Sequence, residues 1–367
     1  MRYDPGELSK NRVKTGLNRV LFSDAMRPVM GIIPPFMLSE IAKRGSSAQK
    51  SQAMKSMLLS ERVRGRREAF GQFYVSQHVG SKCVMEFDAK NSKDLPGTPI
   101  SNPDKSKDPE VKEAYAGANA TYDLYKAAFD RNSIDDKGMC IKSSVHYDEK
   151  YDNAFWEGTQ MVYGDGDGDL FNRFTISIDV IGHELTHGVT EYEAGLEYHD
   201  QPGALNESMS DVFGSIVKQW SKKQTVDKAD WLIGEGLFTK KVKGKALRSM
   251  AAPGTAYDDP VLGKDPQPAN MKNYEKTTDD NGGVHTNSGI PNHAFYNTAM
   301  EIGGRSWEKA GKIWYIALRD RLRPTSDFQS AANCTFLVAA ELFGKGSDEQ
   351  KAVKNGWAGV GVKITVK

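Results

Sequence analysis

The sequence lacks the features that would assign the protein to a membrane, a Sec export route or a nucleic acid. No run approaches the roughly 20 apolar residues of a membrane span, and the first 30 residues lack the apolar core of a secretory signal. The 49 Lys and Arg nearly balance the 48 Asp and Glu, so a net charge of +1 gives no reason to expect nucleic-acid or anionic-membrane binding. We therefore expect synthesis in the cytoplasm and export by a non-classical route for action outside the cell.

Cysteine is also scarce. The three cysteines, Cys83, Cys140 and Cys334, lie far apart in the sequence and form no CxxC pair. This spacing indicates neither a disulfide framework nor a thiolate zinc cluster. We expect three ordinary buried thiols.

The residue pattern divides the chain into three parts. Between about residues 72 and 179, short strand-like runs alternate with Gly, Asn, Asp and Pro clusters, and one helical pattern covers residues 111–129. Beyond residue 179, long helical periods replace the strands. With 367 residues the chain can form two packed domains and an additional segment. A β-rich half joined to a helical half predicts an α+β protein with a cleft between its domains.

The motif HELTH at residues 183–187 lies within a helical pattern. Two imidazoles four residues apart project from one helix face and can bind one Zn²⁺. A catalytic zinc needs a third protein ligand, for which we assign Glu207 in the next helical run, with Asp211 and Asn206 orienting the ligand imidazoles. Taken alone, HExxH can occur in a helix by chance, and acidic residues at a helix start are favoured by the helix dipole, so the neighbouring sequence must decide.

Three long blocks decide between these alternatives. They are DNAFWEGTQMVYGDGDG at 152–168, GHELTHGVTEYEAGLEYHDQPGALNESMSD at 182–211 and DDNGGVHTNSGIPNHAFY at 279–296. In this order and spacing they resemble the thermolysin family (M4) of zinc metalloendopeptidases, and the similarity runs from about Asp88 to the C-terminus. The resemblance implies a thermolysin-like fold, in which a β-rich N-terminal domain and an α-helical C-terminal domain enclose the active-site cleft.

The resemblance also implies a set of catalytic residues. Its zinc ligands are His183, His187 and Glu207, holding one catalytic Zn²⁺. Glu184 is then the general base that takes a proton from the activated water and passes it to the leaving amine. Tyr198 and His285 are the donors to the tetrahedral oxygen, and Asp280 orients His285 and favours its charged form.

Substrate contacts follow from the same resemblance. Asn153 and Ala154 match an edge that hydrogen-bonds an extended substrate backbone, and Arg248 matches a cationic donor to a substrate carbonyl. The positions matching the primary pocket are Phe171, Phe174, Val180, Ile233 and Leu247. They imply a preference for a bulky hydrophobic residue just after the scissile bond, although simple core packing explains apolar residues in this pattern nearly as well.

The calcium site of the family is only partly kept. Asp179, Asp230 and Glu235 match its carboxylates, but Lys218 and Leu232 replace two others. An ammonium in place of a carboxylate removes the charge balance for two Ca²⁺ ions and can neutralise the remaining acids. We expect at most one calcium ion.

The first 70 residues resemble the compact inhibitory propeptide of the protealysin-like branch. We expect a removable propeptide at 1–70, a β-rich domain at 71–197 that includes the HExxH helix, and a helical domain at 198–367. Pro34 and Pro35 fix an extended backbone without N–H donors and Phe36 adds a bulky group, so this PPF motif is expected to lie in the cleft as a poor substrate. A plainer alternative is an apolar staple whose prolines end a helix.

These features predict a monomeric zinc endopeptidase that is made as a zymogen, acts on peptide or protein substrates and holds its own propeptide in the cleft. Two alternatives remain at this point. One is a catalytically silent zinc-binding or adhesion module with the same fold, and the other is an aminopeptidase that uses HExxH.

Overall fold

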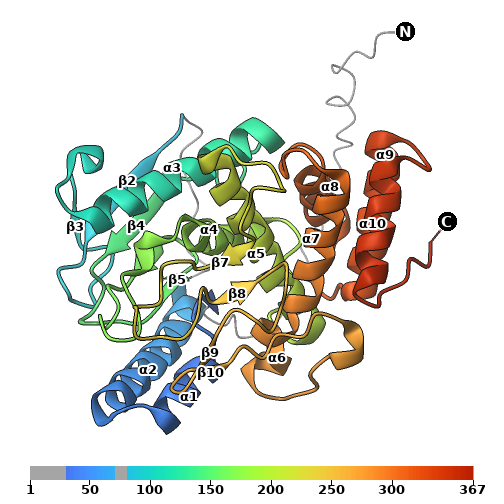
Figure 1. The fold of residues 1–367 in the computed structure, drawn as a ribbon. Coiled ribbons are helices and arrows are strands. Elements are labelled where there is room, and N and C mark those ends of the chain that lie inside the picture. The colour runs from blue at the N-terminus through green and yellow to red at the C-terminus, as the bar shows by residue number, and fades with distance from the viewer. Residues whose placement is uncertain (1–29, 71–80, 367) are drawn as a thin grey trace.

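The computed structural model describes residues 30–70 and 81–366, so the first part of the strand-like region expected from about residue 72 lies outside the described residues. The N-terminal half contains a six-stranded sheet in the order β1-β5-β6-β4-β2-β3 (Figure 1). Its strands are β1 (Met30–Gly31), β2 (Val84–Asp88), β3 (Thr98–Pro99), β4 (Ile141–Val145), β5 (Ala154–Trp156) and β6 (Met161–Tyr163). β4 is parallel to β2 and to β6, and the other neighbours are antiparallel.

Helix α3 (Pro109–Phe129) makes the crossover that the parallel pair β2 and β4 requires. It begins where Asp108 accepts a hydrogen bond from the Glu110 amide and Pro109 occupies the first turn, and it ends at Asp130 in the left-handed conformation. The predicted helix at residues 111–129 is therefore confirmed.

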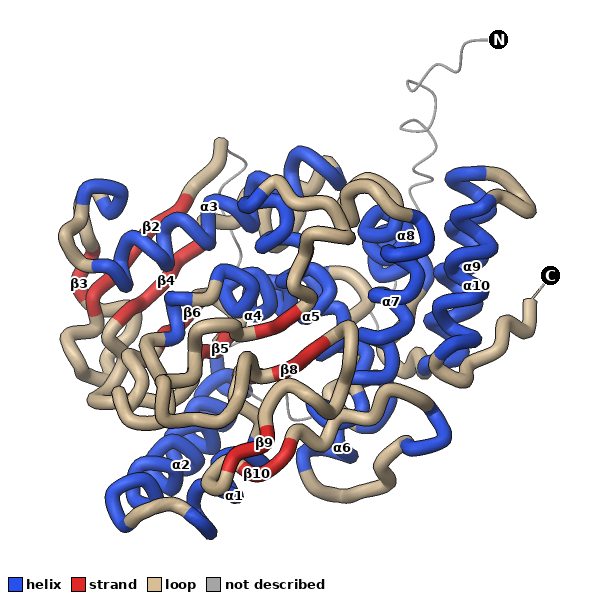
Figure 2. The backbone as a smooth tube through the Cα atoms, in the orientation of Figure 1, coloured by secondary structure: helices blue, strands red, loops and turns tan. Residues whose placement is uncertain are grey.

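The C-terminal half is mainly helical. In Figure 2 helices α7 to α10 occupy the side of the molecule away from the large sheet, and α4 and α5 lie between them and the sheet. The body helices are α4 (Ile178–Tyr192), α5 (Asp200–Lys222), α6 (Asp280–Asn287), α7 (Gly289–Ile302), α8 (Ala310–Ile316), α9 (Phe328–Phe343) and α10 (Asp348–Gly359), with a π-helical turn at Ala317–Arg321. Short antiparallel pairs join β7 (Leu232–Ile233) to β8 (Arg248–Ser249) and β9 (Asp258–Asp259) to β10 (Gly263–Lys264). Short 3₁₀ turns lie at Pro103–Lys105, Phe174–Ile176 and Met271–Asn273. The α+β prediction is confirmed.

We call residues 1–70 the leader and the rest of the chain the body. The described part of the leader contributes strand β1 and two helices, α1 (Pro35–Arg44) and α2 (Ser47–Phe70). α2 lies beside β5 in Figure 1. Within the described residues, no helix combines the length and apolar character that crossing a membrane requires.

Helices α4 and α5 approach closely because glycines lie at their contact. A Cβ atom on Gly214 would lie 2.4 Å from the carbonyl oxygen of Asp179 and 3.0 Å from the amide nitrogen of His183. A Cβ on Gly182 would lie 3.1 Å from the Cα of Gly214. Any larger side chain at Gly214 would push the helices apart, so these glycines set the distance between the residues that α4 and α5 present to each other.

The expectation of three separate thiols is wrong. Cys83 and Cys140 form a disulfide, with their Cα atoms 4.6 Å apart, and only Cys334 is free. The cause is the parallel register that pairs Val84 with Ile141. This register brings the two preceding residues together although they are 57 positions apart in sequence.

Candidate active site

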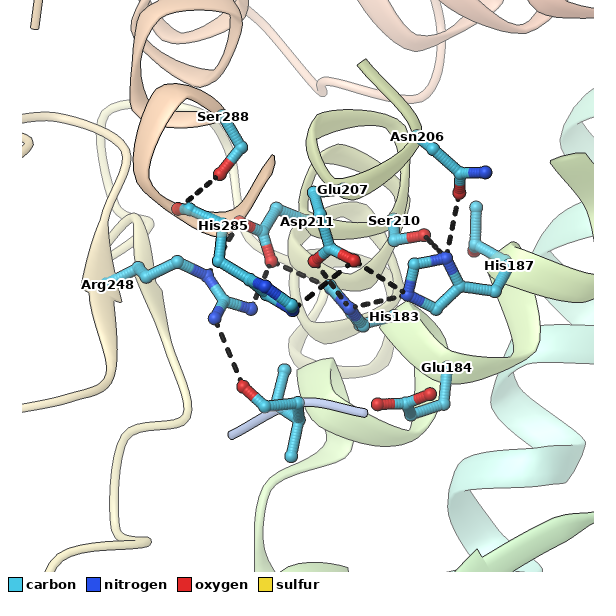
Figure 3. A network of polar contacts seen from close by, with 12 residues as sticks. His183, Glu184, His187, Asn206, Glu207, Ser210, Asp211, Arg248, His285 and Ser288 are labelled. Atoms are coloured by element: carbon cyan, nitrogen blue, oxygen red, sulfur yellow. Dashed lines mark hydrogen bonds and ion pairs between the residues drawn. The ribbon is translucent and has the colours of Figure 1, made fainter. Parts of the chain in front are cut away.

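Two adjacent helices form the metal-binding part of the site. α4 carries His183 and His187, and Glu207 faces them from α5 (Figure 3). One ligand atom from each of the three lies within 4.8 Å of the other two, and the side chains are 0–1% exposed. The two Nε2 atoms are 3.0 Å apart, and each is 3.5 Å from a Glu207 carboxylate oxygen. These residues form a His₂Glu donor set.

The hydrogen bonds of the two Nδ1 atoms determine whether the Nε2 atoms, which face Glu207, carry a proton or a lone pair. His183 Nδ1 is 2.8 Å from Asp211 Oδ1, and His187 Nδ1 is 2.8 Å from Asn206 Oδ1. Both partners are acceptors, so each Nδ1 carries the proton and each Nε2 keeps a lone pair. Burial lowers the pKa of His187 to about 3, which leaves the ring neutral. Two lone pairs and the Glu207 carboxylate thus meet with no proton between them, an arrangement that fits Zn²⁺.

Asp211 is the centre of a buried network that orients His183. Arg248, from β8, donates from Nε to Asp211 Oδ2 and from Nη2 to Oδ1, both at 2.8 Å. Asn292, from α7, donates to Oδ2 at 2.8 Å. Although burial alone would raise the pKa of Asp211, Arg248 and His183 lower it well below its usual range. Asp211 is therefore an ionised acceptor.

Glu184 projects from α4 between the two ligand histidines in sequence and is fully buried. Its Oε2 accepts a hydrogen bond of 3.0 Å from the Trp156 amide on β5, while Oε1 has no hydrogen-bond partner among the described residues. Burial, followed by the nearby Glu207 carboxylate, raises the pKa of Glu184 well above its ordinary value. A carboxyl group with one fixed and one unpaired oxygen is suited to accept and release a proton.

Two donors stand beside Glu207 on the side of α6. The hydroxyl of Tyr198 donates to Glu207 Oε1 and lies 3.2 Å from His285 Nε2, which is itself 3.5 Å from Glu207 Oε1. His285 Nδ1 is 2.8 Å from Asp280 Oδ1. Burial alone would lower the pKa of His285, but Asp280 and Glu207 raise it to about 9, so the ring is charged at neutral pH. Gln267 donates to the backbone carbonyl of His285 at 2.8 Å and fixes its position.

The leader passes through this site as an added strand. β1 pairs antiparallel with β5, and the Ile32 amide donates to the Ala154 carbonyl at 3.1 Å. The Ile33 amide donates to Asn153 Oδ1 at 3.0 Å, and Arg248 Nη1 donates to the Ile32 carbonyl at 3.3 Å. Asn153, Ala154 and Arg248 therefore bind the leader backbone with the groups that the sequence assigned to substrate binding.

The prolines have a different place from the one expected. Pro34 is extended, with φ −64° and ψ 145°, but Pro35 and Phe36 already belong to the first turn of α1. The expectation that the PPF motif itself lies extended in the cleft is wrong, because residues 30–33 occupy that position. Proline is favoured at the first helical position, where no N–H donor is needed, so the motif begins helix α1.

The five apolar residues assigned to the primary pocket are buried. Phe171, Phe174, Val180, Ile233 and Leu247 are 0–2% exposed and belong to the main hydrophobic cluster. Ile32 and Ile33 of the leader are buried in the same cluster. Such burial is also what core packing produces, so the role of these five residues in substrate binding stays a prediction.

The three acids assigned to calcium surround an ammonium group. Lys218 Nζ lies 3.4 Å from Asp179 Oδ2, 2.8 Å from Asp230 Oδ2 and 3.4 Å from Glu235 Oε2. It also donates to the Leu232 carbonyl at 3.4 Å. Burial alone would lower the pKa of Lys218, but these carboxylates raise it, so the side chain stays charged.

Some residues of the site were missed by sequence reasoning. Ser210 Oγ lies 3.0 Å from His187 Nδ1, and its position four residues after Asn206 on one helix face is a signal that could have revealed it. Asn292 and Gln267 come from distant segments, and the sequence holds no comparable signal for either.

Comparisons with known proteins agree with this geometry. The thermolysin metallopeptidase catalytic domain matches residues 65–191, and the thermolysin metallopeptidase alpha-helical domain matches residues 194–362. The chain is 46% identical over 341 residues to the extracellular metalloprotease of Pectobacterium carotovorum subsp. carotovorum, covering 92% of this chain and 98% of that protein. It is 47% identical over 347 residues to protease PrtS of Photorhabdus sp. (strain Az29), covering 91% and 92%. The solved precursor of protealysin, a metalloproteinase from Serratia proteamaculans, is 52% identical with a TM-score of 0.83, covering 91% of this chain and 99% of that one.

Proposed function

The chain belongs to the thermolysin family of metallopeptidases, and on that premise we propose the roles of its individual residues in a zinc-dependent endopeptidase made as a zymogen. His183, His187 and Glu207 hold the zinc, which supplies a Lewis acid that acidifies water and polarises the scissile carbonyl. The observation that carries the proposal is the meeting of two imidazole lone pairs and a carboxylate beside the half-unpaired carboxyl group of Glu184.

Glu184 is the general base. Its Oε2 is fixed by the Trp156 amide, which leaves Oε1 to take a proton from water and later deliver it to the leaving amine. The buried surroundings that raise its pKa favour holding this proton during the transfer.

Tyr198 and His285 stabilise the developing oxyanion. Both polar groups lie beside Glu207, on one side of the metal ligands, and the charge that Asp280 maintains on His285 makes its Nε2–H a strong donor. Arg248 and Asn153 bind the substrate backbone and thereby place the scissile bond. In the zymogen the leader occupies these same groups, which supports its role as an inhibitor.

Four finer properties are part of the proposal. The enzyme prefers a bulky hydrophobic residue after the scissile bond, because its assigned pocket residues are all apolar. It acts as a monomer. It binds at most one calcium ion and none at Lys218, whose ammonium neutralises the acids there. It acts outside the cell after non-classical export, which the Cys83–Cys140 disulfide supports because such bonds persist in oxidising compartments; the relative from Pectobacterium is itself named extracellular.

The substitution Glu184→Ala tests the catalytic assignment. In the full chain it should leave one zinc ion bound per molecule, while cleavage of casein and of the chain's own leader falls on the order of 1000-fold or more. Glu197→Ala, which removes an exposed carboxylate 13 positions along the chain, is the matched control and should process normally. Undiminished casein cleavage by Glu184→Ala would refute the role of general base, whereas zinc binding without casein cleavage in the wild-type protein would favour the alternative of a silent zinc-binding module.

A further inference from the structure

The two faces of the large sheet are covered by different parts of the chain. Side chains alternate along β5 and β6, and Ala154, Trp156, Met161 and Tyr163 belong to the main hydrophobic cluster with α3 and α4. Phe155 and Val162 point the other way into a separate cluster with Ala89, Tyr147 and Tyr151 of the body and Leu59 of α2. The second face of β5 and β6 is therefore covered by a helix of the removable leader.

The second cluster contains an aromatic pocket of the body, formed by Tyr147, Tyr151 and Phe155. Their rings meet edge to face with centroids 5.6 to 6.1 Å apart. Leu59 reaches into this group and is 4% exposed, whereas its neighbour Leu58 faces outward and is 65% exposed. Removal of the leader takes Leu59 away and uncovers the part of the aromatic cluster that it contacts, the kind of apolar surface that binds partners.

The rim of this pocket favours a cation on the partner. Lys55, four residues before Leu59 on the same helix, donates to the Glu149 carbonyl at 2.8 Å and lies 3.3 Å from Asp148 Oδ1. Nearer the start of α2, Gln49 donates to Asp169 Oδ2 at 2.7 Å. These acceptors belong to the body and stay behind when the leader is cut away. Lys93 lies 3.6 Å from Asp148 Oδ2 and Lys241 pairs with Asp169, so each carboxylate keeps one lysine of the body and loses its contact with the leader.

The rim and pocket are also continuous with the cleft. Phe155 lies on β5, the strand that binds the leader backbone through its neighbour Ala154. A chain bound in the cleft can therefore place a second segment on this surface, as the leader does with β1 and α2. When two binding segments are linked in one chain, binding of the first raises the effective concentration of the second at its site.

We propose that the processed enzyme uses this surface, the aromatic pocket with its acidic rim, as a second substrate-binding site. It takes an amphipathic helix of a protein substrate that presents a lysine and, four residues later, a leucine-sized side chain. The proposal rests on the endopeptidase function and adds to it a preference among protein substrates that the cleft alone does not provide.

The test compares cleavage of two substrates by the processed enzyme, from which the leader has been removed. One is a short amino- and carboxyl-blocked peptide that spans the cleft, and the other is the same peptide joined by a flexible linker of about 20 residues to leader residues 46–60. The joined substrate should have a KM about 10-fold lower with kcat unchanged. Leu59→Asp in its helix should abolish this gain, and the matched change Leu58→Asp should keep it, because only Leu59 enters the pocket.

Binding gives a second readout that does not need catalysis. With a zinc chelator present to stop cleavage, the labelled 46–60 segment should bind the processed enzyme, and Asp148→Asn in the body should weaken that binding several-fold. Equal KM values for the two substrates, or equal effects of the Leu58 and Leu59 changes, would overturn the proposal. Binding without cleavage of either substrate would instead contradict the endopeptidase function and leave the second surface supported.

Discussion

Helices α4 and α5 together build two clusters of ligand groups, one fully buried and one that reaches the surface through Asp230 and Glu235. In the first, His183, His187 and Glu207 turn two lone pairs and a carboxylate toward one point, and the charged ring of His285 lies beside Glu207 at 3.5 Å. In the second, one turn earlier on α4, Asp179 joins Asp230 and Glu235 around the ammonium of Lys218. A buried group of ligands needs a cation, and whether the chain supplies it decides between a metal site and a closed ion-pair cluster.

The largest effect should come from removing a ligand of the first cluster. Glu207→Ala leaves two imidazoles and an open site, so bound zinc should be lost and hydrolysis of a blocked peptide should fall on the order of 1000-fold. Glu235→Ala removes a carboxylate of the second cluster, and Lys218 keeps two partners. Zinc content measured by atomic absorption, with peptide hydrolysis in parallel, distinguishes the two variants, because only Glu207→Ala should lose zinc. Full zinc content in Glu207→Ala would contradict the ligand assignment.

A smaller effect is expected from Lys218→Leu, a substitution that should convert the second cluster into a metal site. Lys218→Leu leaves the buried Asp179 with neighbouring carboxylates and no cation, which should lower the free energy of unfolding by about 3–5 kcal/mol in calcium-free buffer. Millimolar Ca²⁺ should restore part of this loss, because ion binding stabilises the folded state. Urea unfolding with and without Ca²⁺ measures both values.

The wild-type protein is the control for that experiment. Lys218 already neutralises the cluster, so its unfolding should not respond to Ca²⁺ through this site. An equal calcium response in the wild-type and Lys218→Leu proteins would show that the ammonium does not take the place of the ion.

The two clusters also show which parts of a site a sequence reveals. His183 with His187, and Asp280 with His285, lie within five residues of each other, so helical or turn geometry alone brings them together. Lys218 was recognised because an ammonium stands where a carboxylate is expected. Asn292 reaches Asp211 from 81 residues away through the packing of α7 on α5, which no local pattern encodes.

Strand register in the sheet is another feature that no local sequence pattern encodes. The Cys83–Cys140 disulfide depends on β2 and β4 pairing in parallel with Val84 opposite Ile141. Strand-like runs predict that both strands exist, but their register follows from packing. The PPF motif is a second case, since its residue types fit both an extended segment and a helix start, and only its packing against the body decides.

A third cluster differs from both because its cation loses its charge when the pH rises. His146 Nε2 lies 2.9 Å from Asp108 Oδ2, and its Nδ1 lies 3.0 Å from Asp165 Oδ1, so an imidazolium joins the start of α3 to the loop after β6. Hydrogen bonding to Asp165, opposed by partial burial, raises the pKa of His146 from 6.5 to about 9.

The smallest predicted effect follows from that shift. A folded-state pKa above the unfolded value gives stability that is fully present below about pH 6.5 and is lost as the pH rises through 9. His146→Gln should therefore cost only about 1 kcal/mol at pH 7, since its carboxylate partners are partly exposed to solvent, and the difference from wild type should disappear above about pH 10. His199→Gln, in an exposed pair with Asp200, should change little at either pH. A cost of His146→Gln that stays constant from pH 7 to above pH 10 would show that packing, and not the proton, closes this third cluster.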